Sequence, residues 1–233
     1  RTPNPCCVCN RDLKFDRLLR FAEELGAEGV VTGHYARIER VEGRPQIFRG
    51  VDAGKDQSYQ LFCVAEENLA RTHLPLGGLQ KSEVRKMAEQ AGLRTAQKAD
   101  SQEVCFIPSN DYRKLLKQEG VELHPGELVD TSGAVLGTHE GTEHFTIGQR
   151  RGLGLQGNTG SPVYVVDIDP ETDRVTLGPN ESLYRTDFWA SRVNFISGEP
   201  PQGPVEITAK IRYKASEATA TVTPEGDGAL VRF

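Results

Sequence analysis

The pattern of apolar residues changes near residue 126, and this change limits the folds that the chain can adopt. Before it, helical and strand-like segments alternate, as in DLKFDRLLRFAEELG, EGVVTGHYARI and KSEVRKMAEQAGL. After it come short strands and turns, for example PVYVVDIDPETDRVTLG, which reads as a hairpin with the turn DPETD. Alternating helices and strands predict a parallel α/β sheet, whereas strands joined by tight turns predict small β-rich modules.

We therefore expect three domains. Residues 1–112 would form part of an α/β parallel-sheet domain, and residues 113–181 would form a small central β-rich domain. Residues 182–233 contain alternating segments such as PVEITAKIRY and EATATVTP, which predict a C-terminal β-barrel or sandwich.

The expected elements of the first domain carry specific residues. The first helix should bury one apolar face and end at Gly26, and its face comprises Phe15, Leu18, Leu19, Ala22 and Leu25. The second helix should turn Val84, Met87, Ala88 and Ala91 inward and end at Gly92. The apolar EVCFIP predicts a short strand that Pro108 ends.

Composition excludes several classes of protein. The net charge of −5 over 233 residues does not suit a general nucleic-acid coat, so RNA binding would need local basic patches. Five cysteines are few and odd in number, which favours a reducing compartment over a disulfide scaffold. No apolar run approaches membrane-spanning length. Because the only methionine is Met87, we expect the chain to belong to a longer protein.

Three of the cysteines, Cys6, Cys7 and Cys9, fall within one turn, PCCVC. Cys6 and Cys9 have the C-x-x-C spacing of a chelating turn or a redox pair, but a structural zinc site commonly needs two such pairs. Cys9 precedes the expected helix, and a helix N-terminus favours a reactive thiolate. We expect Cys7 to be a packing residue and Cys63, inside LFCV, to be a buried small hydrophobe. Cys105 follows the polar DSQE, which suggests a strand that reaches a site.

Each polar motif has a structural and a functional interpretation. His34 in TGHY lies in a strand-end loop and is either a structural hydrogen-bonding group or part of a site. KDQSY, which begins at Lys55, is either a solvated turn or a binding segment. The pairs Arg150-Arg151 and Arg212-Tyr213 suit phosphate contacts or ordinary surface charge.

Six motifs in order resemble the bacterial tRNA-specific 2-thiouridylase family. They are TPNPCCVCNRDLKF, TGHYAR, KDQSY, DSQEVCFI, TIGQRRGLG and YVVDID, and the resemblance runs along the whole chain. It implies a Rossmann-like ATP-pyrophosphatase domain, a small central domain and a C-terminal β-barrel. It also implies a transferase that uses ATP, with Mg²⁺, to adenylate the C2 oxygen of the wobble uridine, position 34 of tRNA. A cysteine persulfide then replaces this oxygen with sulfur to give 2-thiouridine.

The resemblance assigns residues by their match to the family motifs. Cys105 matches the persulfide carrier and Cys9 the second catalytic cysteine, with a transient disulfide between them. The target base is assigned to Asn4, Pro5 and Cys6, and the nucleotide site to Gly33. Contacts with tRNA are assigned to His34, Lys55, Asp56, Gln57, Arg212 and Tyr213. The implied partners are tRNA and a persulfide sulfur donor, such as a cysteine desulfurase or a sulfur-relay protein, in the cytoplasm and away from membranes.

The chain departs from the family pattern at three places. Cys6 stands where family members often carry aspartate, the S-G-G-x-D-S ATP loop is expected upstream of Arg1, and the T-P-G-Q segment is expected beyond Phe233. Three alternatives stay open. Cys6, Cys9 and Cys105 would suit an iron–sulfur-dependent tRNA thiolase. The missing ATP loop would suit a catalytically inactive RNA-binding module, and C-x-x-C would suit a disulfide reductase.

Overall fold

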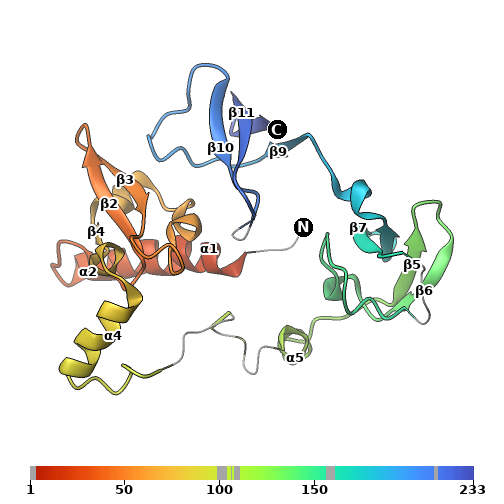
Figure 1. The fold of residues 1–233 in the computed structure, drawn as a ribbon, viewed down its shortest axis with the longest axis horizontal. Coiled ribbons are helices and arrows are strands. Elements are labelled where there is room, and N and C mark those ends of the chain that lie inside the picture. Colours follow the sequence, from red (N-terminus) through yellow and green to blue (C-terminus); the bar gives the residue numbers. More distant parts are fainter. Residues whose placement is uncertain (1–3, 99–103, 106, 108–110, 156–160, 213–214) are drawn as a thin grey trace. The chain divides into compact units, whose positions relative to one another are not determined.

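A computed structural model describes residues 4–98, 104–105, 107, 111–155, 161–212 and 215–233 of the chain. These residues fall into two compact units (Figure 1). One unit lies within residues 101–186, and the other combines residues 4–100 with residues 187–233. Across the described ranges, no helix has the length and apolar character needed to cross a membrane.

A continuous helical run opens the larger unit. It consists of α1 (Pro5–Cys9), a π-helix η1 (Asn10–Arg17) and α2 (Leu18–Glu24), which Figure 1 shows in line. Asn4 is the N-cap, because its side-chain oxygen accepts a hydrogen bond from the Cys7 amide at 3.4 Å, and Pro5 occupies the first helical position. The helix therefore begins before the cysteines. The expectation that Cys9 stands at a helix N-terminus is wrong, since Cys9 is the last residue of α1.

The buried face of this run agrees only partly with the predicted one. Phe15, Leu19 and Ala22 are buried, as expected, but Leu18 is 42% exposed and Leu25 is 69% exposed. The wider turn of the π-helix changes the angular spacing of side chains, so a face drawn with a 3.6-residue period does not apply across it.

The helical run ends at Gly26, as predicted. Gly26 has a φ of +71°, a conformation that glycine adopts without strain. The amide of Ala27 donates to the Ala22 carbonyl at 2.8 Å, and the amide of Gly26 donates to Glu23 at 2.9 Å. These two bonds are those of a Schellman cap.

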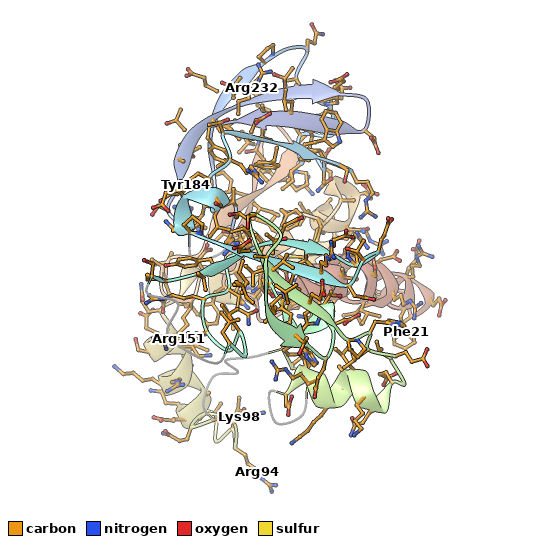
Figure 2. The ribbon with its side chains drawn as sticks, turned by 90° about the vertical axis from the view of Figure 1, so that its right-hand side faces the viewer. Phe21, Arg94, Lys98, Arg151, Tyr184 and Arg232 are labelled. Carbon is orange, nitrogen blue, oxygen red and sulfur yellow. The ribbon has the colours of Figure 1, made fainter. Side chains whose placement is uncertain are left out.

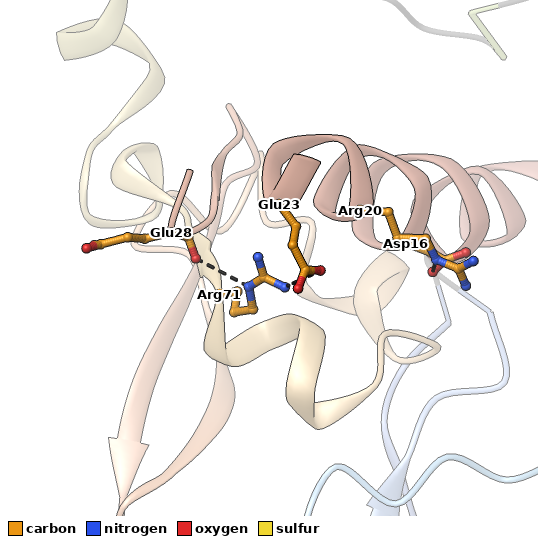
Figure 3. Close-up of polar contacts among 5 residues, drawn as sticks. All are labelled: Asp16, Arg20, Glu23, Glu28 and Arg71. Carbon is orange, nitrogen blue, oxygen red and sulfur yellow. Dashed lines mark hydrogen bonds and ion pairs between the residues drawn. The ribbon is translucent and has the colours of Figure 1, made fainter. Parts of the chain in front are cut away.

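The predicted parallel pairing is present as a two-stranded sheet. Strand β1 (Val30–Val31) pairs in parallel with β4 (Thr72–His73), and the loop Thr32–His34 follows β1. Arg71, before β4, ties this sheet to the helix: its Nε donates to the Glu28 carbonyl at 3.3 Å, and its guanidinium pairs with Glu23 at 3.4 Å (Figure 3).

An antiparallel hairpin and short helices complete the first part of this unit. The hairpin consists of β2 (Ala36–Val41) and β3 (Arg44–Arg49). The helices are η2 (Ser58–Leu61), α3 (Glu66–Ala70), η3 (Pro75–Gly78) and α4 (Lys81–Gln90). Their core comprises Phe15, Ala36, Leu61, Val64 and Leu69.

Helix α4 matches its predicted extent but not its predicted buried face. Met87 is 55% exposed, Ala91 is exposed, and Val84 and Ala88 are only half-buried. Gly92 closes the helix with a φ of +66°, as expected.

The smaller unit holds a mixed four-stranded sheet in the order β6-β5-β8-β7. The strands are β5 (Gly126–Asp130), β6 (Val135–His139), β7 (Tyr164–Asp169) and β8 (Arg174–Gly178). The helices among the described residues of this unit are α5 (Tyr112–Gln118), η5 (Thr142–His144) and η6 (Asn180–Leu183). The hairpin predicted around DPETD is confirmed, because β7 and β8 pair in antiparallel fashion.

The strand predicted at EVCFIP is not present among its described residues. Val104, Cys105 and Ile107 instead form a turn, in which the Ile107 amide donates to the Val104 carbonyl at 3.1 Å. An apolar run alone does not make a strand, since a strand also needs a neighbour to pair with.

The C-terminal segment forms an antiparallel sheet in the order β10-β11-β12-β9. Its strands are β9 (Asp187–Ala190), β10 (Val205–Ala209), β11 (Ala218–Glu225) and β12 (Gly228–Arg232). Within the described residues this sheet is open rather than closed into a barrel.

Candidate active site

The turn that carries Cys6, Cys7 and Cys9 is fixed at its start by Asn4 and after its end by Asn10. Asn4 and Pro5 start α1, and Cys6 and Cys9 are separated by three positions, which places them on one face of the helix. Both side chains are half-buried. Directly after Cys9, the buried Asn10 donates from Nδ2 to the Gln60 carbonyl at 3.2 Å, which anchors the end of α1 to η2.

Cys7 and Cys63 form a second pair of cysteines at this helix. Cys7 is 5% exposed, in agreement with the packing role that we expected. Cys63 is half-buried rather than buried, and its thiol donates to the Cys7 carbonyl oxygen at 3.1 Å.

The loop after β1 brings a histidine against a lysine. His34 is buried, its Nδ1 lies 2.7 Å from Thr32 Oγ1, and its Nε2 lies 3.4 Å from Lys14 Nζ. Burial, with the positive charge of Lys14, lowers the pKa of His34 to about 4. A lysine ammonium only donates, so Nε2 is the acceptor and the neutral ring carries its proton on Nδ1, which donates to Thr32.

His34 therefore faces inward and holds Lys14 in place. Lys14, in the NRDLKF part of the first motif, was not among the predicted site residues. The available signal in the sequence was a lysine inside a dense motif. Gly33 lies beside them, and a Cβ at this position would come 3.6 Å from Leu76 Cδ1.

The KDQSY run forms a structured turn. Asp56 accepts hydrogen bonds from the Gly50 amide at 2.8 Å and from the Ser58 hydroxyl at 2.8 Å. Gln57 Oε1 accepts a hydrogen bond from the Tyr35 amide at 2.9 Å. The run thus connects the hairpin base to the TGHY loop. Lys55 begins this turn and is half-buried.

A cavity of about 330 Å³ opens beside this run, within the larger unit. The first part of the unit contributes Arg49, Asp56, Ser58, Tyr59 and Phe62, and the C-terminal segment contributes Thr208, Lys210 and Glu217. Arg49 forms an ion pair with Glu217 across the cavity. Arg49 and Lys210 were not predicted, because only the fold brings them to the KDQSY run.

One asparagine fastens the C-terminal segment to this cavity wall. Asn194 Nδ2 donates to the Phe62 carbonyl at 2.7 Å and to the Val64 carbonyl at 3.0 Å. The backbone around Phe62, which lines the cavity, is therefore bound to the C-terminal segment.

The remaining predicted residues are placed as follows. Arg212 is exposed and lies in the connection that follows strand β10, near the strand end where we expected it. Tyr213 lies outside the described residues. Cys105 is an exposed residue of the other unit, so its pairing with Cys9 stays a prediction. In the described ranges, no three His, Cys, Asp or Glu side chains are grouped as metal ligands.

The TIGQRRGLG loop presents two cations in the smaller unit. Arg150 and Arg151 are exposed, and Figure 2 shows the side chain of Arg151. Gln149 holds the loop, since its Oε1 accepts from the Thr146 amide at 3.0 Å and its Nε2 donates to the Arg151 carbonyl at 3.0 Å.

Comparisons with known proteins cover the whole chain. Residues 1–109 match the family model described as tRNA methyl transferase HUP domain, and residues 113–179 match the one described as tRNA methyl transferase PRC-barrel domain. The tRNA-specific 2-thiouridylase MnmA of Chlorobium luteolum is 49% identical over 232 residues, which is 98% of this chain and 63% of the relative. The chain belongs to the tRNA-specific 2-thiouridylase family.

Other 2-thiouridylases give the same picture. The enzyme of Geobacter metallireducens is 49% identical over 236 residues, which is 100% of this chain and 63% of the relative. The enzyme of Heliobacterium modesticaldum is 48% identical over 235 residues, which is 99% of this chain and 60% of the relative. The chain thus spans about 63% of the length of such 2-thiouridylases. The HUP match agrees with the Rossmann-like α/β domain that the motifs predicted.

Proposed function

We propose that this chain is part of an enzyme that converts the wobble uridine of tRNA to 2-thiouridine. The observation that carries the proposal is its near 50% identity to a 2-thiouridylase along 98% of its length. The six motifs include Cys9 and Cys105, the two thiols that the proposed sulfur transfer needs.

Cys105 would carry the sulfur as a persulfide. Its terminal sulfur attacks C2 of the activated uridine, which forms a C–S bond as the C2 oxygen leaves. The Cys9 thiolate then attacks the sulfur atom of Cys105. This breaks the bond to the transferred sulfur, releases 2-thiouridine and forms a Cys9–Cys105 disulfide, which a thiol reductant must reopen. The exposure of Cys105 suits delivery of the persulfide by a partner protein, such as a cysteine desulfurase or a sulfur-relay protein.

ATP would supply the AMP group that makes the C2 oxygen a good leaving group. The residues at hand fit part of such a site. The Thr32–His34 loop follows β1 of a parallel pair, and ligands of α/β folds bind at this end of the strands. Gly33 has no backbone or side-chain atom other than Leu76 Cδ1 near its missing Cβ, so a nucleotide can approach its backbone closely. We place no Mg²⁺ ligands among the described residues.

Asn4, Pro5 and Cys6, at the start of α1, would contact the target base. The flanking anticodon would meet Lys55, Asp56, Gln57, Arg212 and Tyr213, with His34 acting through Lys14, which it holds in place. The neighbouring cavity places Lys210 and the Arg49–Glu217 ion pair beside the ring of Tyr59, and an aromatic ring with cations nearby suits unstacked bases.

Membership of this family also suggests how the domains are organised. We propose the domain limits 1–112, 113–181 and 182–233, a C-terminal β-barrel to which β9–β12 belong, and a cytoplasmic location.

The test uses the full-length enzyme with Cys105→Ser. The variant should lose 2-thiouridine formation, measured by mass spectrometry of nucleosides, while its affinity for tRNA stays within about twofold, because a hydroxyl carries no persulfide. Substantial 2-thiouridine formation by this variant would overturn the assignment. An equal loss of tRNA binding would show that Cys105 supports structure or binding rather than sulfur transfer.

A further inference from the structure

Two cysteines that the proposed chemistry does not use lie against each other. The thiol of Cys63 donates to the backbone carbonyl of Cys7 at 3.1 Å. They are 56 positions apart and belong to the same compact unit. The fold therefore brings them together, rather than the local chain.

The two thiols have different surroundings. Cys7 is 5% exposed, whereas Cys63 is half-buried and within reach of small reagents. The neighbouring Cys7 side chain, assisted by the positive charge of Arg11, lowers the pKa of Cys63. The interaction with Cys63, together with burial, raises the pKa of Cys7. Cys63 is thus the thiol that reagents can reach and whose pKa is lowered, and Cys7 is the residue that it contacts.

We propose that Cys7 and Cys63 form a reversible dithiol–disulfide site that hydroperoxides oxidise. An accessible thiolate beside a second thiol is the arrangement of a redox-sensitive pair. The site uses neither Cys9 nor Cys105 and is distinct from the sulfur transfer proposed above.

The oxidation has two balanced steps. The Cys63 thiolate attacks one oxygen of the peroxide, the O–O bond breaks, and hydroxide leaves with a Cys63 sulfenic acid formed. The Cys7 sulfur then attacks the sulfenic sulfur, the S–O bond breaks, and the leaving hydroxide takes the Cys7 proton as water. The two thiols lose two electrons in total, which the peroxide gains, and a thiol reductant reverses the change.

The disulfide would bind α1 covalently to the chain segment after η2. Asn10 already joins these elements through its hydrogen bond to Gln60, so the disulfide would reinforce an existing connection. Cys9 lies in the same helix, and the new bond would hold that helix in its reduced-state position.

The experiment treats reduced, full-length protein with hydrogen peroxide, blocks free thiols by alkylation and maps peptides without reductant. We expect one cross-linked peptide pair that joins Cys7 to Cys63, lighter by two hydrogens than its separate peptides, and lost after reduction. Cys63→Ser should abolish it. The matched control Cys6→Ser changes a cysteine of the same helix and should leave the cross-link unchanged.

The proposal fails if folded wild-type protein forms a Cys6–Cys9 disulfide instead, or if Cys63 only accumulates sulfinic acid. It also fails if Cys63→Ser still traps Cys7 in an intramolecular disulfide to the same extent. Because a hydroxyl at the buried Cys7 position can disturb packing, the half-buried Cys63→Ser carries the test, with circular dichroism as the check of folding.

Discussion

The side chain of Gln57 accepts a hydrogen bond from the backbone amide of Tyr35 at 2.9 Å. This bond joins KDQSY to TGHYAR, two motifs that lie 22 positions apart. The hairpin base, the TGHY loop and the cavity wall therefore form one connected structure. We therefore expect a substitution in one motif to alter the backbone position of the other.

Gln57→Ala should destabilise the protein by about 1–3 kcal/mol, because it leaves the Tyr35 amide without its partner in a partly buried position. Gln57→Glu keeps an acceptor oxygen at the same place and should cost less than half as much. Urea unfolding of both variants measures the difference. Equal losses would mean that the hydrogen bond to Tyr35 contributes little and that Gln57 acts through packing.

His34 should make stability depend on pH. Its pKa is lowered from 6.5 to about 4 in the folded protein, mainly by burial. Between these values the unfolded chain binds a proton that the folded protein does not, so the free energy of unfolding rises with pH. This contribution is complete above about pH 6.5, is lost as the pH falls toward 4, and amounts to about 3 kcal/mol.

His34→Gln tests this dependence, since glutamine can still accept from Lys14 and donate to Thr32 but does not titrate. Urea unfolding at pH 7.5 and pH 5 compares the two proteins. The variant should lose less stability than the wild type on going to pH 5. A wild-type curve parallel to that of the variant would refute a buried, neutral His34.

Lys55→Ala should weaken tRNA binding and lower the slope of log K against log salt by about one unit, because a lysine that faces a phosphate releases about one counterion. Binding measured over a salt series gives the slope. Lys98→Ala, an exposed lysine after α4, is the control and should leave the slope unchanged. If Lys55→Ala and the control behave alike, KDQSY serves only as a structural turn.

Local patterns predicted the local elements of this fold. Gly26 and Gly92 end their helices as expected, and DPETD forms its hairpin, because caps and tight turns depend on neighbouring residues. The start of α1 could also have been predicted, since Asn4-Pro5 is a typical N-cap sequence. We instead predicted that the helix begins after Cys9. The exposure of Leu18 was not readable, because the π-helix departs from the period on which the prediction rests.

The site was predictable as a set of motifs but not as an arrangement. The inward position of His34, its partner Lys14 and the cavity cations Arg49 and Lys210 arise from tertiary contacts that one sequence does not display. The same is true of Cys63, which the apolar LFCV indicated as simply buried. Its contact with Cys7 depends on residues 56 positions away.

Cys6→Asp should keep 2-thiouridine formation within about threefold in the full-length enzyme. The motif resemblance matches Cys6 to a position that aspartate can take in the family, and the Cys6 side chain is half-buried in the first turn of α1. Nucleoside mass spectrometry, together with the absorbance of anaerobically purified protein, gives the readout. A brown wild-type protein that loses its colour and its activity in Cys6→Asp would favour an iron–sulfur mechanism instead.

The central claim is that Cys9 is a reacting thiol of a 2-thiouridylase, and the neighbouring Cys7 provides its control within the same helix. The measurement is 2-thiouridine formed per tRNA in a single turnover by the pre-reduced, full-length enzyme, with ATP and a persulfide donor but no added thiol. Cys9→Ala should lose nearly all product, a fall of at least about 100-fold, since no second thiol remains to release the transferred sulfur. Cys7→Ala should keep most of the activity. Product from Cys9→Ala at the level of Cys7→Ala would contradict the account.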